Sequence, residues 1–121
     1  MGTLDKALLV AEIVMERKAV DPILFDVAGL TSITDYFLIA SGNSSRQVQA
    51  ISRHLKKTMK EKGHKAYGVE GEQEGQWILM DYGDVVVHIF YHPVREFYDL
   101  EGLWSEAPRI GLVKNEGKSI L

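Results

Sequence analysis

The sequence contains no cysteine among its 121 residues. A disulfide framework, a thiolate metal site and a thiol nucleophile are therefore excluded, and burial has to stabilise the fold. No apolar stretch approaches the roughly 20 residues that cross a membrane. Asp5, Lys6 and Glu12 interrupt the apolar N-terminal run, which argues against a signal peptide. We expect a soluble, cytoplasmic protein without a membrane partner.

The sequence also has no excess of basic residues. The 14 Lys and Arg against 17 Asp and Glu give a formal net charge of -3, which argues against broad nucleic-acid binding driven by phosphate neutralisation. A local basic patch is compatible with this balance. Hydrophobic residues make up 45% of the chain, which is enough for the core of one domain.

Hydrophobic periodicity and turn residues predict an α+β fold. The predicted elements are a helix at 4–18, strands at 23–27 and 34–41, a helix at 45–62, a strand at 65–69, two hairpin strands at 77–90 and a helix from Pro93 to Trp104. Strand 34–41, its helix and strand 65–69 predict a right-handed parallel crossover. We therefore expect a mixed sheet of about five strands flanked by helices.

Several element boundaries carry local signals. Thr3 is a suitable N-cap for the first helix, and Asp21-Pro22 is typical of a helix end. Ser44 with Gln47 three residues later forms a capping-box signature ahead of the second helix. These signals separate the helices from the strands.

The C-terminal end differs in composition from the rest of the chain. Beyond residue 106 the periodicity is lost, and Gly, Lys and Asn accumulate. We predict one domain over residues 1–106 and a flexible tail over residues 107–121.

The stretch WILMDYGDVVVHIF predicts a hairpin whose two faces differ. With Tyr82-Gly83 as its two-residue turn, Asp81 lies opposite Asp84. One face is then an aliphatic surface for the helices to bury, made of Ile78, Met80, Val85, Val87 and Ile89. The other face carries Trp77, Leu79, Asp81, Asp84, Val86 and His88.

This second face has two interpretations. An apolar centre of Trp77, Leu79 and Val86 with a polar rim is the composition of a protein interface. Helices on both faces of the sheet would instead make the same residues plain core. Asp81 beside Asp84 favours the interface, because like charges across a hairpin end are destabilising unless they are solvated or face a basic partner.

The pattern of an enzyme is incomplete. The turn SGNSSRQ precedes a helix, as in nucleotidyltransferases that hold a triphosphate on backbone amides. Such enzymes also need two carboxylates spaced by one residue on a strand, and Asp81 and Asp84 lie three apart. No Gly-x-Ser-x-Gly elbow surrounds Ser41, Ser44 or Ser45, so a serine hydrolase is not indicated. We predict no catalytic residues and no cofactor, with a nucleotidyltransferase-like nucleotide-binding enzyme as the alternative.

The pattern of a metal site is also incomplete. Asp81, Asp84, His88 and His92 are suitable ligand types for zinc or iron. Four residues along a strand separate the two histidines too far for both to reach one ion without a bend. We therefore predict no metal.

A basic stretch lies on the second predicted helix. Its residues are Arg53, Lys56, Lys57, Lys60 and Lys62. They fit either a contact with RNA or a solvated helix face. The interleaved Glu61 and the position near the helix C-terminus favour the solvated face.

Three segments carry a resemblance to a known family. They cover residues 26–51, 68–90 and 95–104, and they include the motifs T-D-Y-F, S-S-R-x-V, V-E-G, W-x-x-x-D-x-G-D-V-V-V-H and Y-x-L-E-x-L-W in register. Over about residues 4–106 the chain resembles the Iojap family of bacterial ribosomal silencing factors.

The resemblance implies a non-enzymatic factor. Such a factor binds the ribosomal protein L-fourteen at the intersubunit face of the free large ribosomal subunit. A peripheral contact of this chain with ribosomal RNA is compatible with that role. It sterically blocks joining of the small subunit and represses translation when nutrients are scarce. The family fold is similar to that of nucleotidyltransferases without their catalytic carboxylates, and free members are homodimers.

The hairpin face and the family motifs together predict a partner-binding site. Trp77 is the expected hot spot, and the neighbouring acidic residues are expected to steer a basic partner. Trp104 fits the core as well as it fits the ribosome contact. The predicted site consists of Trp77, Leu79, Asp81, Tyr82, Asp84, Val86, His88, Tyr98 and Glu101.

Overall fold

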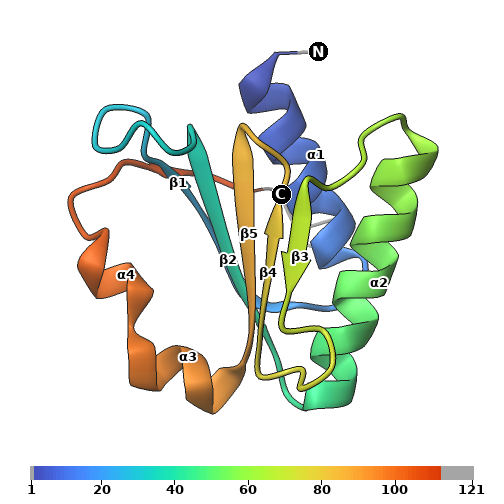
Figure 1. Cartoon of the computed structure of the whole chain (residues 1–121). Coiled ribbons are helices and arrows are strands. Elements are labelled where there is room, and N and C mark those ends of the chain that lie inside the picture. The colour runs from blue at the N-terminus through green and yellow to red at the C-terminus, as the bar shows by residue number, and fades with distance from the viewer. Residues whose placement is uncertain (1, 113–121) are drawn as a thin grey trace, which may run out of the picture.

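Six strands form one sheet with helices on both of its sides (Figure 1). The computed structural model describes residues 2–112. In chain order the elements are α1 (Thr3–Met15), β1 (Val20–Asp26), β2 (Tyr36–Gly42), α2 (Ser45–Glu61), β3 (Gly68–Glu70), β4 (Trp77–Asp81), β5 (Val85–Tyr91), α3 (His92–Tyr98), α4 (Leu100–Leu103) and β6 (Arg109–Ile110). The predicted α+β fold is confirmed. No helix within residues 2–112 has the length and hydropathy needed to cross a membrane.

The sheet is mixed, as predicted. Its strand order is β3-β4-β5-β2-β1-β6, with β2 and β5 parallel and the other neighbours antiparallel. β3 is therefore parallel to β2, but β4 and β5 lie between them. After β2 the chain runs through α2 to β3 at the edge of the sheet. It then passes through β4 to β5, which lies beside β2.

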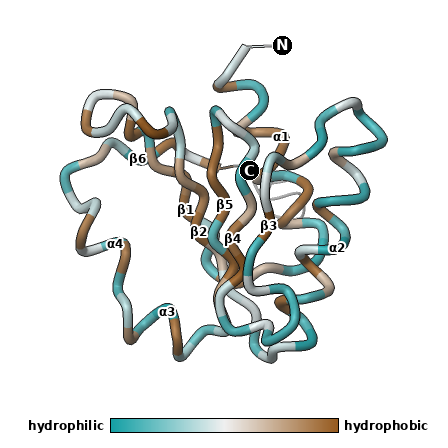
Figure 2. Tube along the Cα trace, in the orientation of Figure 1, coloured by the Kyte–Doolittle hydropathy of each residue, from teal (hydrophilic) through white to brown (hydrophobic). Residues whose placement is uncertain are grey.

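α1 and α2 cover one face of the sheet. α2 contacts this face through Val48, Ile51, Leu55 and Met59, which are all fully buried. The aliphatic face of the hairpin lies against the two helices, as predicted, and its fully buried residues are Ile78, Met80, Val85, Val87 and Ile89. Figure 2 shows hydrophobic residues along the strands and mainly hydrophilic ones along α2.

The start of α2 confirms the predicted cap. The Ser44 hydroxyl accepts a hydrogen bond from the Gln47 backbone N–H at 3.0 Å. The side-chain oxygen of Gln47 accepts a second one from the Asn43 N–H at 2.6 Å. Past the end of the helix, Gly63 adopts φ +90°, a left-handed conformation typical of a helix stop.

α1 differs from its prediction at both ends. Gly2, rather than Thr3, is the N-cap, and no side chain caps this helix. Asp21 and Pro22 lie inside β1, where Asp21 adopts φ +46° beside an irregular register with β2. The predicted helix end at Asp21-Pro22 is wrong: α1 ends at Met15, and this pair lies at an irregularity of β1 that accommodates the proline.

The hairpin turns one residue later than predicted. The Tyr82 N–H donates to the Val85 carbonyl at 2.9 Å, so that Gly83-Asp84 form the turn. Gly83 supplies the left-handed φ of +82° that this turn requires. Each β4 residue therefore pairs with a residue two positions further along β5 than predicted. A shift of two keeps the alternation of side chains, so the residues of both strands stay on their predicted faces.

The predicted C-terminal helix is broken into α3 and α4. Asp99 separates them at φ +47°, and its carboxylate accepts a hydrogen bond from the Gly102 N–H at 3.2 Å. A Cβ at Gly102 would collide with this carboxylate. Pro93 lies in the first turn of α3, as predicted. We call residues 92–107 the C-terminal arm.

Residues 107–112 belong to the fold, in contrast to the predicted flexible tail. Arg109–Ile110 pair with β1 as β6, and the Asp26 N–H donates to the Pro108 carbonyl at 2.8 Å. A two-residue strand leaves no periodicity in a sequence, which explains the error. The rest of the predicted tail, residues 113–121, lies outside the described residues.

We expect Ala107→Asp to detach β6 from the sheet. Ala107 is 5% exposed, and burial of an unpaired carboxylate is strongly unfavourable. The Asp26 amide, which bonds to Pro108, then loses its protection against hydrogen exchange measured by NMR. Glu106→Ala at an exposed neighbour is the control and leaves this amide protected. Unprotected exchange of the Asp26 amide in the wild type would contradict the strand.

Candidate functional site

The second face of the sheet is apolar and aromatic. Its buried side chains form a cluster of their own, separate from the core under α1 and α2. We call this the outer cluster: Phe25, Val27, Phe37, Ile39, Val86, Phe90 and Ala107. Because alternate side chains of a strand point to opposite faces, β5 is apolar on both sides and needs cover on both.

The C-terminal arm covers this face only in part. Figure 1 shows α3 and α4 on the opposite side of the sheet from α1 and α2. Val94, Leu100 and Trp104 of the arm pack against the outer cluster and are themselves only partly buried. The arm is thus a thin cover with apolar side chains on its outer side.

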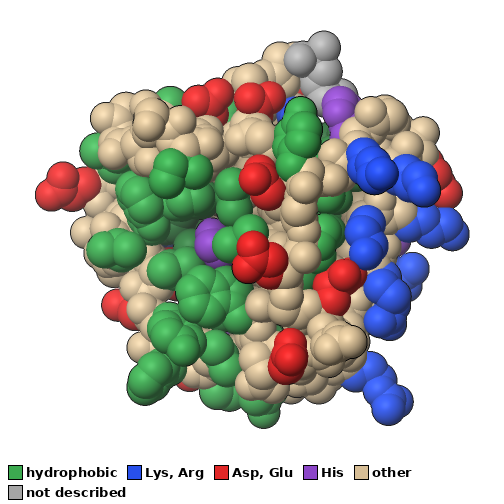
Figure 3. All heavy atoms as spheres, viewed as in Figure 1, with side chains coloured by type: hydrophobic (Ala, Val, Ile, Leu, Met, Phe, Trp, Pro, Cys, Tyr) green, Lys and Arg blue, Asp and Glu red, His purple; other side chains and the backbone are tan. Residues whose placement is uncertain are grey.

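Apolar side chains remain in contact with solvent around this arm. Phe97, Tyr98 and Leu103 are 81%, 52% and 73% exposed. Figure 3 shows a broad hydrophobic area on this side of the molecule, with a histidine near its middle. We call the following partly or largely exposed residues the docking surface: Trp77, Leu79, Phe97, Tyr98, Leu103 and Trp104. An exposed apolar area of this kind is typical of an interaction site.

Trp77 links the sheet to the arm. Its ring centroid lies 4.8 Å from that of Phe90 in the outer cluster and 5.0 Å from that of Tyr98 in α3. A groove of about 400 Å³ lies beside it, lined in part by Val94 and Phe97. Rigid aromatic side chains beside an apolar groove suit insertion of a partner's side chain.

His88 lies inside this surface and does not form a polar rim, in contrast to the prediction. It is 6% exposed, and its Nδ1 accepts a hydrogen bond from the Trp77 indole N–H at 3.0 Å. Burial lowers the pKa of His88 to about 4, so its ring is neutral near pH 7. The neutral ring holds the indole in place, because a protonated ring has no acceptor nitrogen.

The two hairpin carboxylates do not face each other, so the predicted like-charge pair is wrong. Asp81 accepts a hydrogen bond from the Gly83 N–H at 2.8 Å. Asp84 lies in the turn, 3.8 Å from the Lys6 ammonium, with 47% of its side chain exposed. Both carboxylates remain partly exposed, Asp81 on the same face of β4 as Leu79 and Asp84 beside Lys6 of α1.

Besides His88, two further predicted site residues are buried. Tyr82 is 1% exposed and packs in the core under α1 and α2, because the later turn places it on that face. Its burial raises the pKa of Tyr82 to about 12. Val86 is 7% exposed within the outer cluster. Neither side chain is available to a partner in this arrangement.

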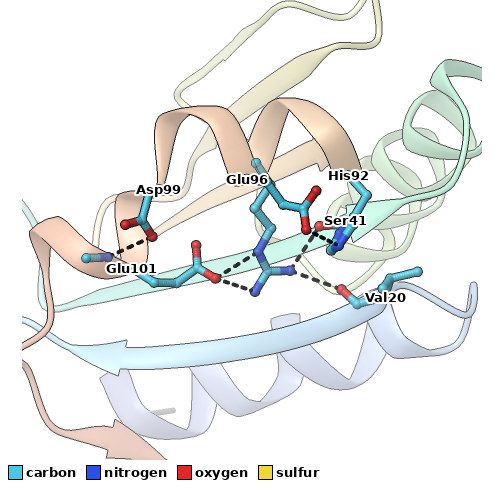
Figure 4. A network of polar contacts seen from close by, with 8 residues as sticks. Val20, Ser41, His92, Glu96, Asp99 and Glu101 are labelled. Carbon is cyan, nitrogen blue, oxygen red and sulfur yellow. Dashed lines mark hydrogen bonds and ion pairs between the residues drawn. The ribbon is translucent and has the colours of Figure 1, made fainter.

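Glu101 forms part of an internal clamp and is not free for a partner as predicted (Figure 4). Its Oε2 lies 3.1 Å from both Nε and Nη2 of Arg95, which is 3% exposed. The same guanidinium donates to the Val20 carbonyl at 3.2 Å and to the Ser41 hydroxyl at 2.9 Å. Arg95 therefore joins the arm to β1 and β2 and sets the position of Tyr98.

Sequence reasoning missed Phe97 and Leu103 as surface residues. It predicted one continuous helix from Pro93 to Trp104, but the break at Asp99 ends α3 after seven residues. The available signal was the pair of adjacent aromatic residues, Phe97 and Tyr98, followed by Asp99 and then by Gly102.

The docking surface is suited to apolar binding. Within residues 2–112 no group of three or more His, Cys, Asp or Glu side chains is placed to hold a metal ion. Ser44 is engaged as a helix cap, and Ser41 is buried against Arg95. Apolar contact is the interaction that the exposed residues can provide.

Comparison with known proteins places the chain in a family. Residues 2–120 match the family model described as "Ribosomal silencing factor during starvation". The chain belongs to the RsfS family of ribosomal silencing factors. The family match extends well beyond residue 106, the predicted end of the domain.

Relatives and solved structures agree with this membership. Ribosomal silencing factor RsfS of Halalkalibacterium halodurans is 42% identical over 104 residues, which cover 86% of this chain and 89% of that protein. RsfS of Bacillus subtilis is 45% identical over 93 residues, 77% of this chain and 79% of that protein. A crystal structure from Chromobacterium violaceum superposes with a TM-score of 0.84 at 35% identity, covering 98% of both chains.

We expect the stability of the wild type to fall as the pH falls from about 6.5 to about 4. The unfolded chain protonates His88 near pH 6.5 and the folded chain only near pH 4, so the unfolded state binds more protons in this window. The loss amounts to roughly 3 kcal/mol. Chemical denaturation at several pH values measures it. His88→Phe should remove this share of the pH dependence, and the control His64→Gln should keep it; equal profiles for wild type and His88→Phe would refute the assignment.

We expect Arg95→Met to lower the free energy of unfolding by roughly 2–4 kcal/mol. The change leaves the Glu101 carboxylate and the buried Ser41 hydroxyl without their donor. Urea denaturation measures the difference. Glu96→Gln is the matched control, because that side chain is 72% exposed and the change should stay within about 0.5 kcal/mol. Wild-type stability of Arg95→Met would show that the clamp is not structural.

Proposed function

We propose that this chain silences ribosomes in the cytoplasm by binding the free large ribosomal subunit through its docking surface. The partner is the ribosomal protein L-fourteen at the intersubunit face, and the bound chain sterically blocks the small subunit. Translation is thereby repressed under nutrient limitation. The observation that carries the proposal is the apolar area that the short arm leaves exposed on a rigid sheet.

The composition of the surface supports a protein partner. Interface hot spots are enriched in Trp and Tyr, and Trp77 and Tyr98 are in contact at its centre. Ribosomal proteins are generally basic, so the carboxylates of Asp81 and Asp84 favour the encounter and the orientation of such a partner. Apolar contact then supplies affinity, and charge supplies specificity.

We further propose that the role is regulatory and involves no catalysis. A nucleotide-binding enzyme is the competing function, and it would need the turn before α2 to receive a triphosphate. The Gln47 side chain already accepts from the Asn43 N–H there, and Ser44 accepts from the Gln47 N–H. Nothing in the arrangement favours this alternative over binding.

In the absence of ribosomes, we propose that two copies pair through the same docking surface, as the family resemblance implies. A homodimer would shield Phe97, Tyr98 and Leu103 from water. Self-association and ribosome binding would then compete for one surface. The concentration of free large ribosomal subunits would set how much of the chain leaves the homodimer.

We expect Tyr98→Ala to reduce co-sedimentation with purified large subunits by roughly tenfold or more in affinity. Tyr98 is 52% exposed, so its loss removes contact area without opening the core. Tyr67→Ala is the matched control, because Tyr67 is 80% exposed and lies outside the docking surface. Equal binding of the two variants, or failure of the wild type to co-sediment, would overturn the proposal.

A further inference from the structure

One side of the molecule is strongly basic although the whole chain is acidic. Residues 45–65 contain seven Lys and Arg and one acidic residue, a formal charge of +6. Since the whole chain carries -3, the other residues together carry -9. Figure 3 shows Lys and Arg side chains gathered along the side where α2 lies, away from the hydrophobic area.

The basic side chains lie along the outer side of α2. We call the exposed ones the basic face: Arg46, Arg53, Lys56, Lys57 and Lys60. From Arg46 to Lys60 this face extends over roughly 21 Å of helix. Within residues 2–112, Lys56 is the only one of the five in an ion pair, with Glu72 at 2.7 Å.

This face has no apolar anchor. The hydrophobic stripe of α2 is fully buried under the sheet, as Val48, Ile51, Leu55 and Met59 all have 0% exposure. A helix that binds a membrane surface needs such a stripe outside, and a protein hot spot needs an aromatic or aliphatic centre. Exposed cations without apolar neighbours are instead suited to a polyanion with evenly spaced charges.

We infer that the basic face binds the phosphate backbone of structured RNA on the large ribosomal subunit. This inference rests on the proposed function and adds a second contact to it. The docking surface and the basic face lie on different sides of the molecule (Figure 3), so one chain can use both at once. Double-stranded RNA is recognised largely through its backbone, which requires cations rather than a base-reading pocket.

The strength of the RNA contact depends on engagement of the docking surface. The acidic remainder of the chain repels RNA, so the basic face binds weakly by itself and only in one orientation. Once the docking surface is engaged, RNA binding becomes intramolecular and gains from the high effective concentration. The RNA contact thereby orients the chain on the subunit.

The test compares two variants that lose the same net charge. Arg53→Gln with Lys57→Gln removes two cations from the basic face, and Thr3→Glu with Arg109→Gln lowers the charge equally at exposed positions elsewhere. Affinity for purified large subunits is measured by co-sedimentation from 50 to 200 mM salt. The first pair should bind about tenfold more weakly at low salt, with a slope of log K against log salt reduced by about 1.5. The second pair should keep the wild-type slope.

Two further probes separate this inference from the proposed function. A labelled 20-base-pair RNA duplex should bind the wild type and Tyr98→Ala at low salt and lose binding to Arg53→Gln with Lys57→Gln. Vesicles of phosphatidylglycerol should not bind. Equal losses for both charge pairs, or vesicle binding without duplex binding, would overturn the RNA contact. Duplex binding by a wild type that ignores large subunits would overturn the proposed function alone.

Discussion

A sheet that is apolar on both faces needs cover on both, and the described residues 2–112 supply full cover for only one of them. α1 and α2 have 13 and 17 residues, whereas α3 and α4 have seven and four. At 1.5 Å per residue, α3 is roughly 10 Å long, less than half of the roughly 23 Å of a seven-residue strand. The apolar area that residues 2–112 leave uncovered is a surface that another macromolecule can cover. The docking surface follows from this difference in length.

The thin cover keeps its position through polar contacts and not through helix length. Helices of four and seven residues are unstable by themselves. Arg95 holds them by binding Glu101 within the arm and the backbone and hydroxyl of Val20 and Ser41 in the sheet. Because the guanidinium is planar, its N–H groups point in fixed directions. The arm therefore lies where these groups reach their partners in the sheet and in the arm. Phe97 and Tyr98 are presented to solvent in a defined geometry as a result.

The sequence was sufficient to predict the faces of the hairpin but not its register. Side-chain alternation has a period of two, so an error of two positions left Trp77 and Ile78 on their predicted faces. Gly83 was predicted as the second residue of the turn, whereas in the structure it is the first and adopts the left-handed conformation there. The cap of α2 was predictable because Ser44 and Gln47 act within one turn.

The remaining errors concern tertiary contacts. β6 exists only because β1 offers an edge to it, and no local pattern in Arg109–Ile110 announces a strand. Burial of Tyr82, and the engagement of Glu101 by Arg95, likewise depend on residues distant in the chain. The exposed part of the site therefore moved from the middle of the sheet toward the arm, where Tyr98 is the one predicted residue that is more than half exposed.

The two sides of the molecule carry opposite chemistry, apolar with acidic neighbours on one and cationic on the other, and a ribosomal subunit offers protein and RNA to match them. The most direct measurement is light scattering of subunit joining, with large subunits incubated with the chain before small subunits are added. The account predicts a dose-dependent loss of joined particles that saturates near one chain per large subunit. Full joining at saturating chain would contradict it.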